Sequence, residues 1–527
     1  MKGTELLKNT EYRLLRGSAE QEISAVIVDN RKIVPGCLFI CIRGVNFDAH
    51  EHIEEIARAG AAVIVIEESW LEKNSLPDTG DAAVLSVHNT REAKAYAFSA
   101  WYGEPSKKMT CIGITGSKGK TTTAALMMSI LEEAGRKAGI IGTNGVQIGG
   151  EQHDLANTTP DSDDMQKYLA EMVEAGCEYA VIECSSQGLM LHRPDAIDFD
   201  YGIFTNIEEG DHVGPNEHRS FEEYLYCKSL MLRWSRVGIV NRDDIHVDQL
   251  LDGVDTPILF YGHEGRFDVN SRSGAVGGYE QGASREGEDP RKIENKPLSY
   301  IISGETKETR DGDPGIRFRV AGKLQGEFFV GLPGIFNAEN ALAALAVMNE
   351  CGIPEDAMRK AIEHVHIKGR IDMVYRSKDF NVCVDFAHNG YSTRNLLQAL
   401  REYEPKRLIC IFGADGNRAR SRRTEMGEAS GNGADLSIVT SGHNRWETFE
   451  QILPAIEEGL AKTDGDYIVI PNRKDAIRYA VENRKPGDLI TIIGLGHENY
   501  QEEKGVKYPY SDTDFVRSVL KEQGLIK

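Results

Sequence analysis

Hydrophobic and polar positions along the chain fall into short blocks that predict buried strands separated by helices. Apolar, β-branched runs bounded by Gly and Pro occur at residues 25–44 and 60–68, a pattern typical of buried strands. We therefore expect residues 1–107 to form a small α/β domain.

The second block opens with a strand at 109–116, a glycine turn, and a helix at 120–139 whose Leu, Met and Ile positions share one face. Residues 178–186 and 199–207 indicate further parallel strands that end in polar residues. Ligands of open α/β sheets bind at such strand ends. This block, residues 108–366, is therefore expected to be the catalytic domain.

From residue 367 to 527, strand-like segments alternate with helical ones, which predicts a second parallel-sheet domain. The strands are expected at 380–388, 407–414, 436–442, 467–471 and 488–496. Residues 271–315 interrupt the pattern with a polar stretch rich in Gly and charge, and we expect an exposed, mobile loop or hairpin insertion there. The predicted fold class is α/β with three domains.

Composition narrows the function classes. The 527 residues carry a formal net charge of -21, which argues against extended contact with nucleic acid or anionic lipid. No apolar run is long enough to cross a membrane and no secretory signal is evident, so a cytoplasmic protein without membrane insertion is expected. Nine cysteines without C-x-x-C spacing predict free thiols instead of a disulfide framework or a zinc site.

Residues 113–123, "GITGSKGKTTT", form a glycine loop between the predicted strand and helix. Such a loop directs backbone N–H groups and the positive helix end at an anion. Lys120 can reach the β- and γ-phosphates of a nucleotide, and the Thr121 hydroxyl can ligate Mg²⁺. Only two residues separate Gly116 from Gly119, so the spacing is shorter than in the common phosphate loop.

Two further strand ends carry candidate metal ligands. Glu183 ends one apolar strand, while Asp211 and His212 follow another. Mg²⁺ prefers oxygen ligands, and one or two carboxylates suffice to hold it. Taken alone, Glu183 fits a salt-bridging residue and His212 a structural one, and it is their convergence on one sheet edge that favours a site.

Ten segments in order closely resemble the Mur ligases of peptidoglycan synthesis, and most of all their MurE type. They are "TGSKGKTTT", "TTPD", "ECSS", "FTNIEEGDH", "EEYLYCKSLM", "NRDD", "LPGIFNAENALAA", "GRIDMV", "VDFAHN" and "GLGHENYQ". The resemblance covers nearly the whole chain and implies ATP-dependent amide formation. ATP phosphorylates a substrate carboxylate, and an incoming amine displaces phosphate from the acyl phosphate.

The resemblance also implies cofactors and substrates. Two Mg²⁺ sites are expected, with Thr121, Glu183, His212 and Lys228 as ligands and Lys228 carbamylated by CO₂. Lys120, Glu183, His212 and Lys228 would be catalytic. The partners would be UDP-muramoyl-dipeptide and a free amino acid, bound by a monomer.

The remaining site residues are assigned by resemblance alone. The ATP site would comprise Gly116, Ser117, Lys118, Gly119, Lys120, Thr121, Thr122, Asn337, Asn340, Arg370, Asp385, His388 and Asn389. The UDP-sugar substrate would contact Val28, Asn30, Asn157, Thr158, Thr159, Ser185 and Arg193. The incoming amino acid would contact Arg423, Gly442, His443, Asn444, Arg445, Gly494 and Glu498.

The sequence departs from the family at the amino acid site. Members that add diaminopimelate carry Asp-Asn-Pro-Arg where this chain has residues 442–445, Gly-His-Asn-Arg. The retained Arg445 suits a carboxylate and favours meso-diaminopimelate over lysine, although another diamino acid stays open, as does a purely loop-bracing role. Gln187 and Leu191 also differ from the usual His and Gln, and residues 210–224 include two extra positions.

Three other function classes share part of this sequence pattern. A folylpolyglutamate synthase, or another related amide ligase with a different acceptor, shares the chemistry, but a folylpolyglutamate synthase would not need the first 107 residues. A P-loop kinase or motor ATPase would release phosphate without an amine and would have no use for a carbamylated lysine. A catalytically silent scaffold would be favoured only if ATP failed to bind.

Overall fold

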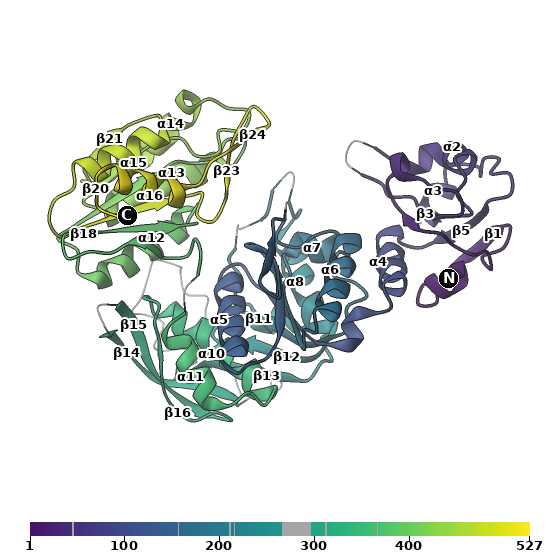
Figure 1. Ribbon diagram of the computed structural model, residues 1–527, viewed down its shortest axis with the longest axis horizontal. Coiled ribbons are helices and arrows are strands. Elements are labelled where there is room, and N and C mark those ends of the chain that lie inside the picture. The colour runs from purple at the N-terminus through teal and green to yellow at the C-terminus, as the bar shows by residue number, and fades with distance from the viewer. Residues whose placement is uncertain are drawn as a thin grey trace, which may run out of the picture. The chain divides into compact units, whose positions relative to one another are not determined.

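The computed structural model describes residues 1–527 except 45–46, 156, 210–211, 215–216, 266–296, 311–312, 366 and 527 (Figure 1). The chain divides into two compact units. The first contains residues 1–301, 322–324 and 342–358, and the second contains 302–321, 325–341 and 359–527. The first two predicted domains thus fall largely into one unit, and the domain boundaries near 107 and 366 stay predictions.

The first unit begins with a small sheet in the strand order β1-β5-β4-β3-β2. Only β1 runs antiparallel to its neighbour. The strands are β1 (Arg13–Arg16), β2 (Val26–Ile27), β3 (Leu38–Ile40), β4 (Val63–Glu67) and β5 (Ala83–Val87). Short helices α1 (Gly3–Leu6), α2 (Ile53–Arg58) and α3 (Glu68–Leu71) and the longer α4 (Thr90–Trp101) accompany this sheet. The prediction that the chain begins with a small α/β fold is confirmed.

The central sheet of the first unit has the order β13-β12-β11-β6-β10-β7-β8-β9. Strands β13 to β7 are parallel, while β8 and β9 return as antiparallel neighbours. The strands are β6 (Thr110–Thr115), β7 (Ala138–Gly142), β8 (Gly145–Ile148), β9 (Glu151–His153), β10 (Tyr179–Glu183), β11 (Phe199–Phe204), β12 (Ser235–Asn241) and β13 (Ile258–His263).

Helices of the first unit pack on this sheet and place loops at its carboxyl edge. Helix α5 packs against β7 and β10, and α8 packs against β11 and β12. The helices are α5 (Lys120–Glu133), α6 (Ser162–Glu174), α7 (Ser186–Met190), α8 (Phe221–Arg233) and α9 (Val247–Leu250). Because the parallel strands share one direction, the ends of β6, β7, β10 and β11 meet at one edge.

The second unit contains β14 to β16 and a separate parallel sheet. Most of β14 (Tyr300–Arg310) and β15 (Asp313–Gly322), with all of β16 (Gly326–Val330), belong to it, and β15 and β16 pair antiparallel. Part of the predicted insertion at 271–315 is therefore regular strand, and its residues 271–296 lie outside the described residues. Helix α10 (Phe336–Glu350) is shared between the units, whereas α11 (Glu355–Glu363) follows it.

The parallel sheet of the second unit has the order β17-β18-β22-β19-β20-β21, with only β17 antiparallel. Its strands are β17 (Asp372–Tyr375), β18 (Phe380–Asp385), β19 (Arg407–Phe412), β20 (Leu436–Val439), β21 (Tyr467–Val469) and β22 (Asp488–Ile493). The hairpin β23 (Tyr500–Glu503) and β24 (Val506–Pro509) follows. The predicted strands of this block are confirmed.

Alternate residues of β19 pack into two different cores, which shows why helices cover both faces of this sheet. Leu408, Cys410 and Phe412 pack into one core with α12, α13 and α14, whereas Ile409 and Ile411 pack into another with α15 and α16. Successive strand residues point to opposite faces, so an all-apolar strand needs cover on both. The helices are α12 (Gly390–Leu400), α13 (Arg420–Gly433), α14 (Phe449–Leu460), α15 (Arg473–Glu482) and α16 (Asp512–Glu522).

Candidate functional site

The glycine loop between β6 and α5 is held in an anion-binding shape. Gly116 has φ of 151° and Gly119 has φ of 88°, where it caps α5. A Cβ on Gly116 would lie 1.9 Å from Thr205 Oγ1, so only glycine fits. Lys120 Nζ folds back to donate to the carbonyl oxygens of Gly116 at 2.7 Å and Ser117 at 3.3 Å. The ammonium therefore lies over the loop where phosphates would bind.

Glu183 lies at the end of β10, buried at 1% exposure, and both of its carboxylate oxygens accept hydrogen bonds. Thr121 Oγ1 donates to Oε2 at 2.9 Å, and the Thr143 backbone N–H donates to Oε1 at 3.0 Å. The Thr143 hydroxyl adds a bond to Oε2 at 3.0 Å. Gly142 provides the room, because a Cβ there would lie 2.2 Å from Glu183 Oε1. The predicted Thr121 and Glu183 ligands thus come together.

His212 and Lys228 gather around another side chain, Tyr224 of α8. The Lys228 ammonium nitrogen lies 4.6 Å from the Tyr224 ring centroid, and the His212 ring centroid lies 5.9 Å from it. Lys228 is 1% exposed. The Tyr224 hydroxyl shares a 2.7 Å hydrogen bond with Ser117 Oγ of the glycine loop. Tyr224 therefore connects the phosphate loop with the helix that carries Lys228.

His218 is a buried residue that the sequence did not single out. Its ring is 0% exposed and stands 5.2 Å from the Tyr224 ring, and neither ring nitrogen has a hydrogen-bond partner among the described residues. Burial lowers its pKa below the usual value. The residue lies in the segment between β11 and α8, where periodicity gives no signal.

Residues expected to contact the muramoyl-peptide form a network beside Glu183. Thr159 Oγ1 donates to the Glu183 carbonyl at 2.9 Å and accepts the Ser185 N–H at 2.9 Å, while Arg193 Nη1 donates to the Thr159 carbonyl at 2.9 Å. Thr158 shares a 3.2 Å bond with Thr143. The structure thus places four of these predicted residues in or beside the Glu183 network.

Of the three remaining residues of that predicted set, one directly precedes Thr158 and two lie near the start of the chain. Asn157 is exposed in the loop before α6, while Val28 and Asn30 follow β2 in the small first sheet. Two residues of the predicted ATP site, Lys118 and Thr122, lie in the glycine loop and at the start of α5, respectively. The Lys118 N–H donates to Asn206 Oδ1 at 2.9 Å.

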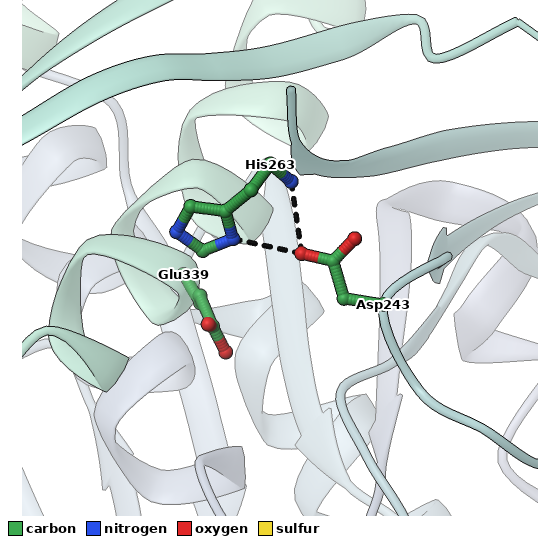
Figure 2. Close-up of side chains that lie close together, drawn as sticks. All are labelled: Asp243, His263 and Glu339. Carbon is green, nitrogen blue, oxygen red and sulfur yellow. Dashed lines mark hydrogen bonds and ion pairs between the residues drawn. The ribbon is translucent and has the colours of Figure 1, made fainter. Parts of the chain in front are cut away.

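Asp243 and His263 form a buried pair after β12 and at the end of β13 (Figure 2). Asp243 Oδ2 accepts the His263 backbone N–H at 2.8 Å and its Nδ1–H at 2.7 Å. This pair fixes the loop after β12 to the neighbouring strand. Glu339, drawn in the same view, belongs to the second unit.

A hollow of about 410 Å³ lies at the opposite, amino-terminal ends of the central strands. Its walls include Lys107, Glu178, Asp198, Asp200 and Arg236, while the glycine loop does not line it. Strand direction separates this hollow from the carboxyl edge, so we assign the chemistry to the glycine loop.

The predicted ATP residues of the second unit are mostly engaged in local structure. Asp385 is buried at the end of β18, accepts backbone N–H groups of Ile371 at 2.8 Å and Ala387 at 2.7 Å, and has a pKa raised by burial. The Arg370 guanidinium lies 4.8 Å from the Phe386 ring centroid. His388 is hydrogen-bonded to the Phe386 carbonyl oxygen, and Asn389 caps α12. Asn337 donates to the Pro333 carbonyl oxygen, and Asn340 donates to Asn337.

The residues predicted to contact the incoming amino acid gather between the ends of β19, β20 and β22 and the β23–β24 hairpin. Arg423 Nη1 donates to Glu447 Oε1 at 3.0 Å, and this guanidinium lowers the Glu447 pKa. Arg445 has φ of 52°, donates through Nη2 to Asp415 Oδ2 at 3.2 Å and lies 3.9 Å from Glu502 Oε2.

Glu498 supplies a carboxylate to this cluster, and His443 and Tyr500 are hydrogen-bonded to it. His443 is 3% exposed and lies 2.8 Å through Nε2 from Glu498 Oε2. Tyr500 donates to Glu498 Oε1 at 3.3 Å. Gly442 accepts a hydrogen bond from Gln501 at its carbonyl oxygen. Gly494, with φ of 109°, and Asn444 complete the predicted set.

The glycine loop between β6 and α5 has the geometry of a phosphate-binding loop, and the hydrogen-bonded Glu183 carboxylate lies beside it. Together with the second parallel sheet, these features are those of a nucleotide-dependent α/β enzyme. Comparison with known proteins specifies the class. Residues 114–348 match the Mur ligase middle domain, and residues 369–496 match the Mur ligase glutamate ligase domain.

The chain is 34% identical over 526 residues to a UDP-N-acetylmuramoyl-L-alanyl-D-glutamate--2,6-diaminopimelate ligase of Caldanaerobacter subterraneus, covering 99% of both chains. A protein of Aquifex aeolicus with the same name is 33% identical, with 96% of this chain and 95% of that protein covered. The chain therefore belongs to the Mur ligase family, and it is an ATP-dependent amide-forming ligase.

Solved structures confirm the fold class. A structure named as a UDP-N-acetylmuramoyl-L-alanyl-D-glutamate--2,6-diaminopimelate ligase superposes with a TM-score of 0.65 at 24% identity, with 99% of both chains covered. A folylpolyglutamate synthase of Mycobacterium tuberculosis gives 0.56 at 17% identity and covers 77% of this chain and 92% of its own. The alternatives of a kinase or motor ATPase and of a catalytically silent scaffold do not fit a family of ligases.

Proposed function

We propose that this enzyme joins meso-2,6-diaminopimelate to UDP-N-acetylmuramoyl-L-alanyl-D-glutamate with hydrolysis of ATP to ADP. The relatives described above are named as ligases of UDP-N-acetylmuramoyl-L-alanyl-D-glutamate and 2,6-diaminopimelate. The observation that carries the proposal to this chain is the cluster of Arg423, Arg445 and Glu498, which offers cations and an anion at one place. A zwitterion with an additional carboxylate and ammonium needs both kinds of charge.

The first chemical step depends on the glycine loop. Lys120 and the backbone N–H groups at the start of α5 would hold the β- and γ-phosphates while the substrate carboxylate attacks. A carboxylate is a poor electrophile, and phosphorylation provides a leaving group for the amine that follows. Positioning and charge neutralisation account for most of the acceleration.

The oxygen donors of the site fit Mg²⁺. Thr121 Oγ1 and Glu183 Oε2 are already 2.9 Å apart, and hard cations select such hydroxyl and carboxylate ligands. When bound, Mg²⁺ supplies neutralisation of phosphate charge. His212 and Lys228, both beside Tyr224, would complete the ligand set of two sites.

We further propose that Lys228 is carbamylated. At 1% exposure its side chain is almost removed from water, where a charged ammonium is costly to maintain. Reaction of the neutral amine with CO₂ forms an N–C bond and releases a proton, leaving an anionic carbamate. Such a group would balance a nearby divalent cation.

The residues around Thr159, Ser185 and Arg193 would hold the muramoyl-peptide, and Val28 and Asn30 the uridine end. We place the enzyme in the cytoplasm as a monomer, where its cysteines, all free thiols in the structure, stay reduced. No helix in the described part of the chain has the length and apolar character to cross a bilayer.

The test is phosphate release from ATP with UDP-muramoyl-dipeptide, offering meso-diaminopimelate, lysine, ornithine and diaminobutyrate separately. We expect release with diaminopimelate, a product heavier by one diaminopimelate residue in mass spectrometry, and ADP as the nucleotide product. Preference for lysine would refute the amino acid assignment, and formation of AMP would refute the acyl phosphate route.

A further inference from the structure

His443 is held by two hydrogen bonds that together fix its protonation and orientation. Its Nδ1 accepts the backbone N–H of Glu502 at 3.0 Å, so Nδ1 carries no proton. The ring of a neutral histidine then carries its hydrogen on Nε2, which donates to Glu498 Oε2 at 2.8 Å. His443 is 3% exposed, and the Tyr500 ring lies 5.0 Å from it, so the imidazole is packed as well as bonded.

Glu498 differs from the other carboxylates of this cluster in its partners. Glu447 is paired with Arg423 and Asp415 with Arg445, so each of those negative charges faces a guanidinium. The Glu498 oxygens instead accept from neutral donors, His443 Nε2–H and the Tyr500 hydroxyl at 3.3 Å. Neutral donors orient a carboxylate without cancelling its charge, and the Glu498 side chain is 20% exposed and so still reachable.

We infer that His443 is a positioning residue that, as the neutral Nε2–H imidazole, aims Glu498 at an ammonium group of the incoming amino acid. The inference rests on the proposed function and deepens it. Both ring nitrogens of His443 are engaged with protein atoms, so the residue acts through Glu498 and not by direct contact with substrate. A preorganised anion spares the substrate the entropy cost of ordering a flexible glutamate.

Two substitutions separate the two hydrogen bonds of the ring. In His443→Asn the side-chain oxygen reaches the place of Nδ1 and keeps the Glu502 N–H satisfied, but no donor reaches Glu498. In His443→Gln the amide nitrogen reaches the place of Nε2 and keeps the donor to Glu498. The pair therefore tests the Glu498 bond apart from the loop's own backbone bond.

Steady-state kinetics use meso-diaminopimelate, or whichever diamino acid the wild type prefers. In His443→Asn we expect KM for the amino acid to rise about tenfold, because one hydrogen bond to a charged group is lost. The kcat should stay within about threefold, and KM for ATP and UDP-muramoyl-dipeptide should not change. His443→Gln should keep KM for the amino acid within about threefold of the wild type.

A double-mutant cycle checks that the effect passes through Glu498. Adding His443→Asn to Glu498→Gln should change KM for the amino acid less than twofold, because the partner is already neutral. Should His443→Asn not fold, as judged by thermal melting, His443→Met replaces it as the variant without a donor.

An unchanged KM for the amino acid in His443→Asn, an equal rise in all three KM values, or full additivity in the cycle would each overturn the inference. A wild type that uses none of the offered amino acids refutes the proposed function instead and is distinguished by that result.

Discussion

Replacement of Arg445 by alanine tests the proposed preference for diaminopimelate most directly. The guanidinium lies 3.2 Å from Asp415 and 3.9 Å from Glu502, and its side chain is 24% exposed. An incoming carboxylate would thus meet a cation that already balances two anions. Removal of the cation takes away an attractive partner and leaves Asp415 and Glu502 to repel the substrate.

The size of the effect follows from the loss of one partner of a close charge pair, about 2 to 5 kcal/mol. Because the Arg445 side chain is about a quarter exposed, solvent screening favours the lower end. At about 1.4 kcal/mol for each factor of ten, we expect roughly a thirtyfold fall in kcat/KM for diaminopimelate. Lysine, which has no second carboxylate, should lose much less.

The assay compares kcat/KM for diaminopimelate and lysine in the wild type and in Arg445→Ala. Arg420→Ala is the matched control, because Arg420 is an exposed arginine of the same unit paired with Glu458. An equal fall for both amino acids would show that Arg445 only braces the loop. A preference for lysine that Arg445→Ala leaves intact would refute the charge argument.

Three further substitutions test other parts of the structure. Lys228→Ala should abolish ligation while ATP still binds. Short carboxylates should restore part of the activity if a carbamate is the ligand. Full activity of the variant would exclude Lys228 as a metal ligand. Gly116→Ala should remove ATP binding in calorimetry, since the Cβ would lie 1.9 Å from Thr205 Oγ1. Asp512→Asn leaves the buried Arg473 without its charged partner and should destabilise the protein by about 3 to 5 kcal/mol in urea unfolding; a loss below about 1 kcal/mol would contradict this.

The parallel strands and the glycine loop could be predicted because local pattern determines them. An apolar run such as β10 must be buried, and a strand followed by glycines and a helix must place its loop at the sheet edge. The Thr121–Glu183 contact follows, since both residues lie at that edge. Thr143 could have been found by the same rule, because it directly follows the end of β7.

The contacts around Tyr224 and His443 could not be predicted in this way. Tyr224 reaches Ser117 across 107 positions, and His443 reaches Glu498 across 55. Both contacts join loops or helix ends, where no periodic pattern fixes the direction of side chains. The resemblance assigned His443 to the amino acid site, and the hydrogen bonds of its two ring nitrogens could not be read from the sequence.

The rebuilt loop at residues 442–445 replaces one source of rigidity by another. The Asp-Asn-Pro-Arg pattern that the sequence resemblance implies for diaminopimelate-adding members would place proline where this chain has Asn444, and proline restricts the backbone by its ring. Here the loop is tied to the β23–β24 hairpin, because Gln501 donates to the Gly442 carbonyl oxygen at 2.8 Å and the Glu502 N–H donates to His443. The hairpin that orders the loop also directly follows Glu498. The residue proposed to bind the ammonium and the loop that carries Arg445 are therefore held by the same few hydrogen bonds. Selectivity for the amino acid should therefore depend on this hairpin as much as on the residues that contact the substrate.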